Sequence, residues 1–462
     1  MRILVVLILG CAAFSLTASA QEASPRLTAV HCGHLVDTLG GRLLGETTVL
    51  VSGARIQAVE PGHDTPPGAK EVDLSALTCL PGLIDDHTHL TDQTSTSGYV
   101  DKFHWNLADY VVRSTVYARR TLLAGFTTVR NVGDSHNESV ALRNAINAGV
   151  IVGPRIFTAG VPLSSTGGHA DPTNGYRMDL AADPGVMQGI INSPEEAVKA
   201  VRLHYKLGDD LIKIMPSGGV LDESSSGDNP QLTIEEIKAV VSTAHDYGFT
   251  VAAHAHGAEA IRRAVIGGVD SIEHGTFMND EDMRLMKEHG TWYVPTIIAG
   301  TFVAQMAKVP GYYPPQVAAK AAAIGSQILG TAGRAYRAGV KIAFGTDAAV
   351  YPHGENAHEL ELMVQAGMPT LFVLQAATMH SAQLLKKDHD LGSVSPGKFA
   401  DVIAVEGNPL DDIGIMKHVT FVMKAGVIYK QDGKAIDHDV QPQWSAGPPS
   451  PAAATAAEDF DF

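Results

Sequence analysis

The chain has 462 residues, and 34 Lys and Arg against 50 Asp and Glu give a formal net charge of −16. Hydrophobic residues make up 45% and charged residues 18%, a composition that excludes a mostly disordered chain and indicates a globular one. The acidic balance argues against sequence-independent binding to nucleic acid, because that binding needs a basic surface for the phosphates. Three cysteines without a Cys-x-x-Cys pair exclude a disulfide framework and a cysteine-based zinc finger.

Residues 1–20 have the composition of a secretory signal peptide. Arg2 gives a positive start, residues 3–14 form an apolar run too short to cross a bilayer, and Ala18-Ser19-Ala20 fits a cleavage site. A lipoprotein signal at Cys11 is the alternative, although the apolar run before it is short. We expect secretion into a bacterial periplasm. The sequence does not distinguish a periplasmic protein from one that is exported out of the cell. No other stretch is long and apolar enough to span a membrane, so no membrane association is expected after cleavage.

Residues 80–390 alternate between strand and helix patterns. Short apolar segments rich in β-branched residues predict eight strands that are buried on both faces. They are Leu80–Ile84, Thr127–Asn131, Arg155–Ala159, Leu211–Met215, Thr250–Ala253, Ser271–Glu273, Trp292–Thr296 and Lys341–Phe344. Helices between them begin at capping residues such as Ser193, Thr233 and Asn279. This is the pattern of an α/β fold of the (β/α)8, TIM-like barrel type, with a doubly wound open sheet as the alternative.

The two ends of the mature chain differ from its middle. Residues 24–79 and 391–435 contain short strand patterns separated by turn residues such as Gly40-Gly41 and Pro396-Gly397. Neither segment can bury a sheet alone, so we expect them to pair into one small β-sandwich domain beside the barrel. Residues 441–462 are rich in Pro, Ala and Ser, which predicts a weakly ordered tail.

Histidines, a lysine and an aspartate follow or interrupt the predicted strands near their C-terminal ends, where barrels of this kind carry their functional groups. In chain order they are His87, His89, Lys213, His254, His274 and Asp347. Side-chain alternation in an extended segment puts His87 and His89 on one face. Neutral imidazole and carboxylate are zinc ligands, so the set predicts a metal site.

Each of these residues also has an ordinary structural explanation. A His-x-His pair arises by chance in a chain with 20 histidines, and a single histidine at a strand end is usually a satisfied polar residue. Lys213 is more informative, because an ammonium in the segment Leu-Ile-Lys-Ile-Met must be neutral, modified or paired with a carboxylate. The six residues together therefore indicate a metal centre more strongly than any one of them.

Two segments resemble signatures of the amidohydrolase superfamily. Residues 81–89, Pro-Gly-Leu-Ile-Asp-Asp-His-Thr-His, resemble its first barrel strand, and residues 395–401, Ser-Pro-Gly-Lys-Phe-Ala-Asp, resemble the return to its β-sandwich. The resemblance covers nearly the whole mature chain. It implies a barrel with a β-sandwich and a centre of two divalent metal ions, usually zinc.

The motifs near the strand ends resemble one branch of that superfamily. The segment around Lys213, residues 254–257 and residues 272–275 are similar to those of Xaa-Pro and Xaa-Arg dipeptidases and ochratoxin-hydrolysing amidases. Nucleobase deaminases are disfavoured, because they carry His-x-x-Glu where this chain has His-Ala-His-Gly at residues 254–257.

The resemblance also implies roles for individual residues. The implied ligands are His87, His89 and Asp347 for one ion, His254 and His274 for the other, and a Lys213 carboxylated by CO2 as the bridge. The centre would activate water for attack on an amide carbonyl, and Asp347 would pass the proton to the leaving amine. His169, in a Gly-rich loop after the third strand, is the candidate donor to the oxyanion.

The expected function is hydrolysis of an amide next to a C-terminal amino acid in a dipeptide, an N-acyl amino acid or an ochratoxin-like amide. Recognition of the free carboxylate needs cationic or hydrogen-bonding side chains, for which Tyr176, Arg177 and Tyr351 are candidates. His256 faces either the substrate or a metal ligand, and Gly218–Leu221 would give the pocket an apolar wall.

Two other functions remain open at this point. A cyclic amide or lactone hydrolase could use the same metal centre, and a non-catalytic periplasmic binding protein could retain the barrel as a receptor. The lysine in the metal set argues against the receptor. Small molecules or dipeptides are the expected partners, and the sequence leaves open whether the chain forms a homo-oligomer.

Overall fold

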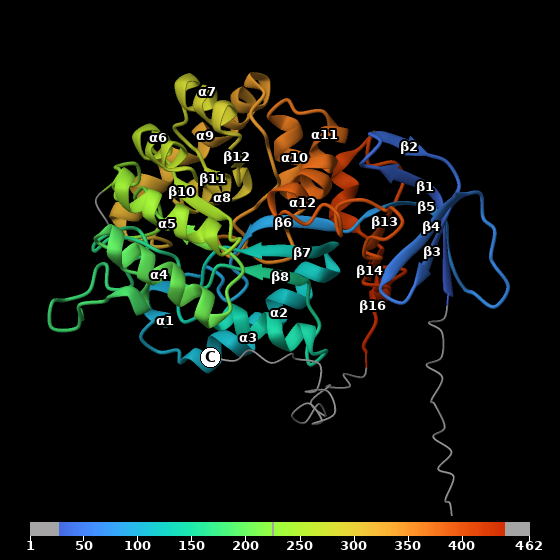
Figure 1. Cartoon of the computed structure of the whole chain (residues 1–462), viewed down its shortest axis with the longest axis horizontal. Helices are drawn as coiled ribbons and strands as arrows, with labels where there is room; N and C mark the ends of the chain where they lie inside the picture. Colours follow the sequence, from blue (N-terminus) through green and yellow to red (C-terminus); the bar gives the residue numbers. More distant parts are fainter. Residues whose placement is uncertain (1–26, 224–225, 439–462) are drawn as a thin grey trace, which may run out of the picture.

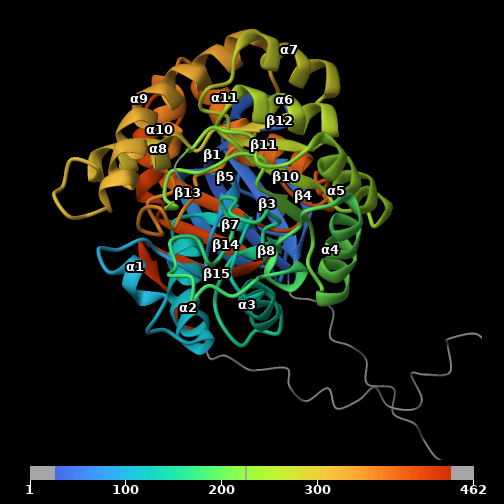
Figure 2. The same ribbon diagram turned by 90° about the vertical axis from the view of Figure 1, so that its left-hand side faces the viewer.

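The computed structural model describes residues 27–223 and 226–438. It combines a mixed sheet with parallel strands that helices surround, as Figures 1 and 2 show. The expected signal peptide, residues 1–20, and tail, residues 441–462, lie outside the described residues. Within the described ranges, no helix has both the length and the apolar character that crossing a membrane requires.

The strands, in chain order, are β1 Leu27–Asp37, β2 Arg42–Leu44, β3 Thr47–Ser52, β4 Arg55–Pro61, β5 Lys70–Pro81, β6 Leu83–Thr88, β7 Phe126–Asn131, β8 Arg155–Thr158, β9 Ile212–Ile214, β10 Val251–Ala255, β11 Ser271–His274, β12 Trp292–Val294, β13 Val402–Glu406, β14 Phe421–Lys424, β15 Val427–Gln431 and β16 Lys434–Ala435. The α-helices are α1 Gly98–Asp101, α2 Leu107–Leu123, α3 Glu138–Asn147, α4 Pro194–Leu207, α5 Ile234–Asp246, α6 Ala258–Gly267, α7 Asp280–His289, α8 Ile297–Met306, α9 Pro315–Ala338, α10 His358–Gln365, α11 Thr370–Gln375 and α12 Ser381–Leu384. Short helical segments of other types are η1 Val186–Gln188, η2 Ala376–His380 and η3 Ile413–His418.

Both ends of the described chain share one sheet. Its nine strands have the order β16-β15-β14-β13-β5-β1-β3-β4, with β2 beside β1. The two chain ends meet where β13 pairs antiparallel with β5, with Ile403 opposite Leu80. Residues of both ends therefore form one continuous hydrogen-bonded sheet, and its description as a β-sandwich domain separate from a barrel domain stays a prediction.

A disulfide joins two neighbouring strands of this sheet. Cys32 of β1 and Cys79 of β5 are bonded and fully buried, with Cα atoms 5.8 Å apart. The sequence excluded a framework of several disulfides but did not predict this single bond, because only the pairing of β1 with β5 brings the two cysteines together. The bond closes a loop across a sequence separation of 47.

The middle of the chain forms two parallel sheets, β6-β7-β8 and β12-β11-β10-β9. Isolated bridges extend them, since Leu163 pairs with Ile214 and Tyr293 with Ile342. The eighth predicted strand, Lys341–Phe344, is not a strand in the structure. Its Phe344 carbonyl nevertheless accepts a hydrogen bond from Asp86 N of β6 at 2.9 Å. The result is a TIM-barrel-like α/β arrangement, with the strands at the centre and the helices outside (Figure 2).

The first predicted strand, Leu80–Ile84, is divided between two sheets. β5 ends at Pro81 in the mixed sheet and β6 begins at Leu83 in the parallel one, with Gly82 between them. A Cβ atom at Gly82 would lie 2.1 Å from Thr127 Oγ1, so only glycine fits this close approach. The continuous apolar run hides this change of sheet.

The predicted capping residues start three of the outer helices. The side chains of Ser193, Thr233 and Asn279 accept hydrogen bonds from backbone N–H groups in the first turns of α4, α5 and α7. Such caps satisfy donors that a helix leaves unpaired at its N-terminus. They fix where each helix begins, so that its apolar face packs on the strands.

Loss of the disulfide should destabilise the protein. Because it constrains a loop of this length in the unfolded chain, replacing both Cys32 and Cys79 by serine should lower the free energy of unfolding by about 2–4 kcal/mol. Urea titration followed by circular dichroism measures the change. A thiol reductant should weaken the native protein to the same extent and leave the double variant unaffected. An unchanged unfolding midpoint would contradict the prediction.

Candidate active site

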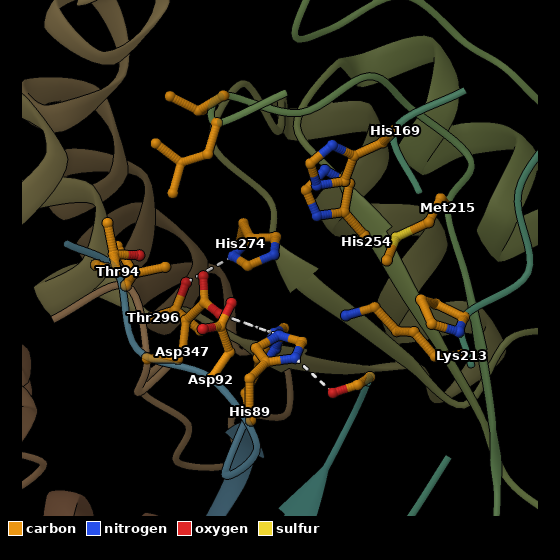
Figure 3. A pocket seen from close by; sticks show the side chains of 18 of the residues that line it. His89, Asp92, Thr94, His169, Lys213, Met215, His254, His274, Thr296 and Asp347 are labelled. Atoms are coloured by element: carbon orange, nitrogen blue, oxygen red, sulfur yellow. Dashed lines mark hydrogen bonds and ion pairs between the residues drawn. The ribbon is translucent and has the colours of Figure 1, made fainter. Parts of the chain in front are cut away.

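The six residues of the predicted metal set gather on one cavity of about 310 Å³ at the C-terminal ends of the parallel strands (Figure 3). The rings of His87 and His274 have centroids 4.8 Å apart, and those of His254 and His274 are 4.6 Å apart. The lining residues of this set are His87, His89, Lys213, His254, His274 and Asp347. Residues from five separate parts of the chain therefore meet here.

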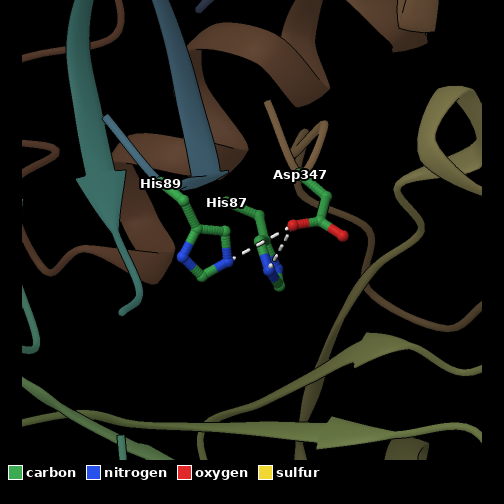
Figure 4. Close-up of side chains that lie close together, drawn as sticks. All are labelled: His87, His89 and Asp347. Carbon is green, nitrogen blue, oxygen red and sulfur yellow. Dashed lines mark ion pairs between the residues drawn. The ribbon is translucent and has the colours of Figure 1, made fainter. Parts of the chain in front are cut away.

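His87, His89 and Asp347 form the tightest group (Figure 4). The Nε2 atoms of His87 and His89 lie 3.4 Å and 3.3 Å from the same carboxylate oxygen, Oδ1 of Asp347. One ligand atom from each residue lies within 4.8 Å of the others. Two imidazoles and a carboxylate at this spacing could hold one metal ion.

The second nitrogen of each of these histidine rings is held by the protein. His87 Nδ1 donates to Glu273 at 2.8 Å, and His89 Nδ1 donates to the carbonyl oxygen of Gly133 at 3.0 Å. His274 Nδ1 bonds to Thr296 Oγ1 at 2.8 Å. Outer partners of this kind orient metal-binding histidines and leave their other nitrogen available. The residues present therefore fit a metal ion.

Glu273 is a buried carboxylate between two partners. Arg130 donates to one of its oxygens at 2.8 Å, while His87 donates to the other. Burial acts to raise the pKa of Glu273, but Arg130 and His87 outweigh it and hold that pKa at about 2. The carboxylate is therefore ionised and fixes the orientation of the His87 ring.

Lys213 reaches into the cavity from β9 (Figure 3) and is only 1% exposed. Burial lowers the pKa of Lys213 to about 8, although Glu273 and Asp347 favour the charged form. Burial also acts to raise the pKa of Asp347, but His87 and His89 outweigh it and keep that carboxyl well below its usual range. Asp347 is therefore ionised in the cavity.

His254 and His256 are buried in the cavity wall. Burial lowers the pKa of His254 well below its usual value and that of His256 to about 3, so both rings are neutral. His256 Nδ1 bonds to Thr276 Oγ1 at 2.8 Å, and its ring stacks on His274. His256 therefore contacts the predicted ligand His274 and also lines the cavity.

His169 also lines the cavity. Its ring stacks on His254 with centroids 4.4 Å apart, and its Nδ1 contacts the carboxylate of Asp222. Lys320 of α9 lies 3.0 Å from the other carboxylate oxygen of Asp222. Asp222 thus orients His169, and Lys320 holds Asp222.

The three residues expected at the substrate carboxylate are not among the described residues that line this cavity, and their role stays a prediction. Arg177 is 74% exposed and pairs with Asp179 in the same surface loop. Tyr176 packs on Phe103 outside the cavity. Tyr351 is 1% exposed and lies in the core behind the lining residues. No local sequence pattern predicts these positions, because they depend on how the loops fold back.

Four residues on the cavity adopt a left-handed backbone conformation that side chains rarely tolerate. They are His274 (φ 68°), Thr296 (φ 52°), Asp347 (φ 61°) and Ala349 (φ 126°). Strained non-glycine residues of this kind persist where the surrounding structure imposes them, and they cluster at functional sites. The geometry of the strand ends therefore adds an independent sign of function here.

Sequence reasoning missed the residues that support the site from behind or from the loops. Arg130 holds Glu273, the carboxylate that orients His87, and Thr296 bonds to His274. Asp92, Tyr110 and Ser135 line the cavity from loops and helices. One signal existed, because residues 272–274 place a glutamate inside a buried strand directly before a predicted ligand. The loop residues had no such pattern.

The sequence model of the amidohydrolase family matches residues 78–430 of this chain. The chain belongs to the amidohydrolase family. This amidohydrolase is 34% identical to ochratoxinase of Aspergillus niger over 375 aligned residues. The alignment covers 77% of this chain and 76% of the relative.

Solved structures show the same relationship. A Xaa-Pro dipeptidase with methionine bound in its active site is 46% identical, with a TM-score of 0.84 over 87% of this chain and 100% of that one. A prolidase complexed with N-methylphosphonate-L-proline is 31% identical, with a TM-score of 0.80 over 88% and 100%. The amidohydrolase is therefore an enzyme that hydrolyses amide C–N bonds. The alternative of a non-catalytic receptor is thereby rejected. Its family is generally metal-dependent.

His353 packs beside the site and is 3% exposed. Its ring stacks on Tyr117 of α2 with centroids 4.7 Å apart, and its Nε2 donates to the carbonyl oxygen of Asp92 at 2.8 Å. Burial lowers the pKa of His353 to about 4. The ring is therefore neutral in the folded protein and holds a cavity-lining loop through its single N–H.

The free energy of unfolding should fall as the pH drops from about 6.5 to 4. Histidine in the unfolded chain takes up a proton near pH 6.5, whereas His353 stays neutral in the fold until about pH 4, so acid favours unfolding. His353→Gln should remove about 3 kcal/mol of that decrease. Urea titrations at several pH values test this, with the exposed His289→Gln as the control. Equal pH dependence in both variants would contradict it.

Proposed function

We propose that this amidohydrolase cleaves the amide bond that precedes a C-terminal amino acid, as a dipeptidase or carboxypeptidase with two divalent metal ions. The observation that carries the proposal is Lys213, a buried lysine within one cavity that is also lined by the four histidines of the predicted metal set and by an ionised aspartate. His87, His89 and Asp347 would hold one ion, and His254 and His274 the other. Zinc suits these ligands.

A carbamate on Lys213 would serve as the bridge between the ions. Burial disfavours the lysine ammonium, and CO2 converts a neutral amine into an anion that suits two cations. The alternative is a plain ion pair with Glu273, whose charge is already balanced by Arg130 at 2.8 Å.

The residues around the cavity have complementary roles in amide hydrolysis. A bound divalent ion supplies Lewis acidity and lowers the pKa of water that it binds. Asp347 accepts the proton of the attacking water and returns it to the leaving amine. His169 donates a hydrogen bond to the oxygen that becomes negative, with Asp222 fixing its ring. The parallel strands that carry these groups are proposed to close into the complete (β/α)8 barrel.

The relatives support a C-terminal amino acid as the leaving group. One solved relative holds methionine in its active site, another is complexed with N-methylphosphonate-L-proline, and a third relative is named ochratoxinase. In this chain Val220, Leu221, Val303 and Ile328 line the same cavity and would accommodate an apolar side chain. A cyclic amide or lactone hydrolase remains the second candidate, because the same residues would serve it.

We also propose that the enzyme is secreted, with the periplasm as its compartment. The buried disulfide between Cys32 and Cys79 supports this, since such bonds persist in oxidising compartments. It adds to the composition of residues 1–20.

Removal of the Lys213 amine should remove metal from the protein. After zinc and bicarbonate loading and desalting, elemental analysis should find about two ions per native chain. Lys213→Ala should hold at most one and lose turnover, because the bridge between the ions is gone. The exposed Lys199→Ala is the matched control and should load like the native chain. Two ions in Lys213→Ala would take the lysine out of the metal centre.

A library of dipeptides and N-acyl amino acids, with lactones and cyclic amides alongside, tests the reaction itself. The zinc-loaded enzyme should release free C-terminal amino acids, which mass spectrometry detects. Asp347→Asn should lower kcat by at least about 100-fold, the size of a lost proton transfer, and still retain an ion. Asp179→Asn, a surface carboxylate, is the control. Hydrolysis of lactones alone would favour the second candidate, and a near-normal rate in Asp347→Asn would reassign the proton transfer.

A further inference from the structure

A second chamber of about 360 Å³ adjoins the catalytic cavity. The two share part of their walls, namely Asp92, Thr94, Tyr110, Ser135, His169 and Leu221. In Figure 3, Asp92 and Thr94 lie on one side of the catalytic cavity and Lys213 and Met215 on the other. A substrate whose amide lies among the histidines can therefore extend past Asp92 into the second chamber.

The wall of this chamber is acidic. Its carboxylates are Asp92, Asp101, Asp171, Asp222 and Glu223, and Lys102 is its single Lys or Arg among the described lining residues. The lysine ammonium lies over the ring of Tyr176, 4.5 Å from its centroid.

Some of this negative charge is already balanced. Lys320 pairs with Asp222, and Arg113 stacks on Trp105 behind the wall at 3.7 Å. Asp171 accepts hydrogen bonds from Gly167 N and from Thr173, which stabilise its charge without neutralising it. Even with Lys320 and Arg113 counted, carboxylates outnumber cations around the chamber.

Aromatic side chains complete the wall. Tyr99, Trp105, Tyr110 and Tyr313 line the chamber, and aromatic faces attract cations. Tyr313 is 6% exposed, and its hydroxyl has no hydrogen-bond partner in residues 27–223 and 226–438. A buried hydroxyl without a partner is costly, so this position favours a polar ligand group.

We propose that this chamber binds the acyl half of the substrate and selects a positively charged one, such as the side chain of an N-terminal Lys or Arg in a dipeptide. The inference rests on the proposed function and adds to it the charge of the residue before the cleaved bond. The substrate's own C-terminal carboxylate would be repelled here, which keeps the leaving amino acid in the catalytic cavity.

Asp92 occupies the position that suits the N-terminal ammonium. It lines both cavities, whereas Glu223 and Tyr313 line only the outer chamber. The α-ammonium of a dipeptide is close to the reacting carbonyl, while a lysine carries its second charge on a four-carbon stem. Asp92 is therefore placed for the first charge and Glu223 for the second.

Matched substrates test the selection on the metal-loaded full chain. Dipeptides that begin with Lys, norleucine or Glu and end with the same residue differ mainly in charge. The Lys peptide should have a kcat/KM at least about tenfold above norleucine, and the Glu peptide should fall below norleucine by a similar factor. Added salt should reduce both differences.

Variants assign the selection to the chamber. Asp92→Asn and Glu223→Gln should each bring the ratio of Lys to norleucine peptides several-fold closer to one. The exposed Glu281→Gln on α7 removes the same charge elsewhere and should preserve the ratio. A ratio that neither chamber variant changes would overturn the assignment.

Binding to metal-free protein gives a readout that does not depend on catalysis. Lysine amide and norleucine amide are the probes, and calorimetry should find lysine amide bound at least about tenfold more tightly. Equal rates together with equal affinities would overturn the inference and leave the proposed function intact. Selective binding of lysine amide without hydrolysis of any peptide would overturn the proposed function while supporting the cation site.

Discussion

The site depends on one buried carboxylate, Glu273. A carboxylate this deep in the protein is stable only with partners, and here Arg130 holds one oxygen while His87 holds the other. Because Glu273 accepts the Nδ1 proton of His87, the opposite nitrogen of that ring faces Asp347. Arg130 also donates to the backbone of Asp86, so the same network joins β7 and β11 to the strand that carries the His-x-His pair.

The C-terminal ends of the parallel strands carry several buried ionisable side chains. The cavity holds buried histidines that stay neutral, an ionised aspartate and a buried lysine, all with pKa values shifted from their usual range. Shifted pKa values of this kind cluster at functional sites. The left-handed conformations of His274, Thr296 and Asp347 show that the backbone is held to present them. These residues adopt a backbone conformation that non-glycine residues rarely favour, and it sets the positions of their side chains.

The two adjoining cavities differ in the polarity of their walls. The catalytic cavity has an apolar wall around Val220 and Val303, whereas the adjoining chamber is lined by carboxylates and aromatic rings. Asp222 lines the adjoining chamber and contacts the ring of His169, which lines both cavities, and it is itself held by Lys320 of α9. The wall between the two cavities is therefore stabilised by an ion pair with Lys320 of α9, a helix outside the strands.

The sequence by itself determined the family, the alternation of strands and helices, and the caps at Ser193, Thr233 and Asn279. It also singled out the six residues that gather on one cavity, because these features depend on local patterns and on residues next to strand ends. Only the tertiary structure decided where β5 gives way to β6, that Cys32 meets Cys79, and that Tyr176, Arg177 and Tyr351 are not among the residues that line the cavity. The physical reason is distance along the chain: strand pairing, loop closure and the acidic chamber arise from segments that no local pattern relates to one another.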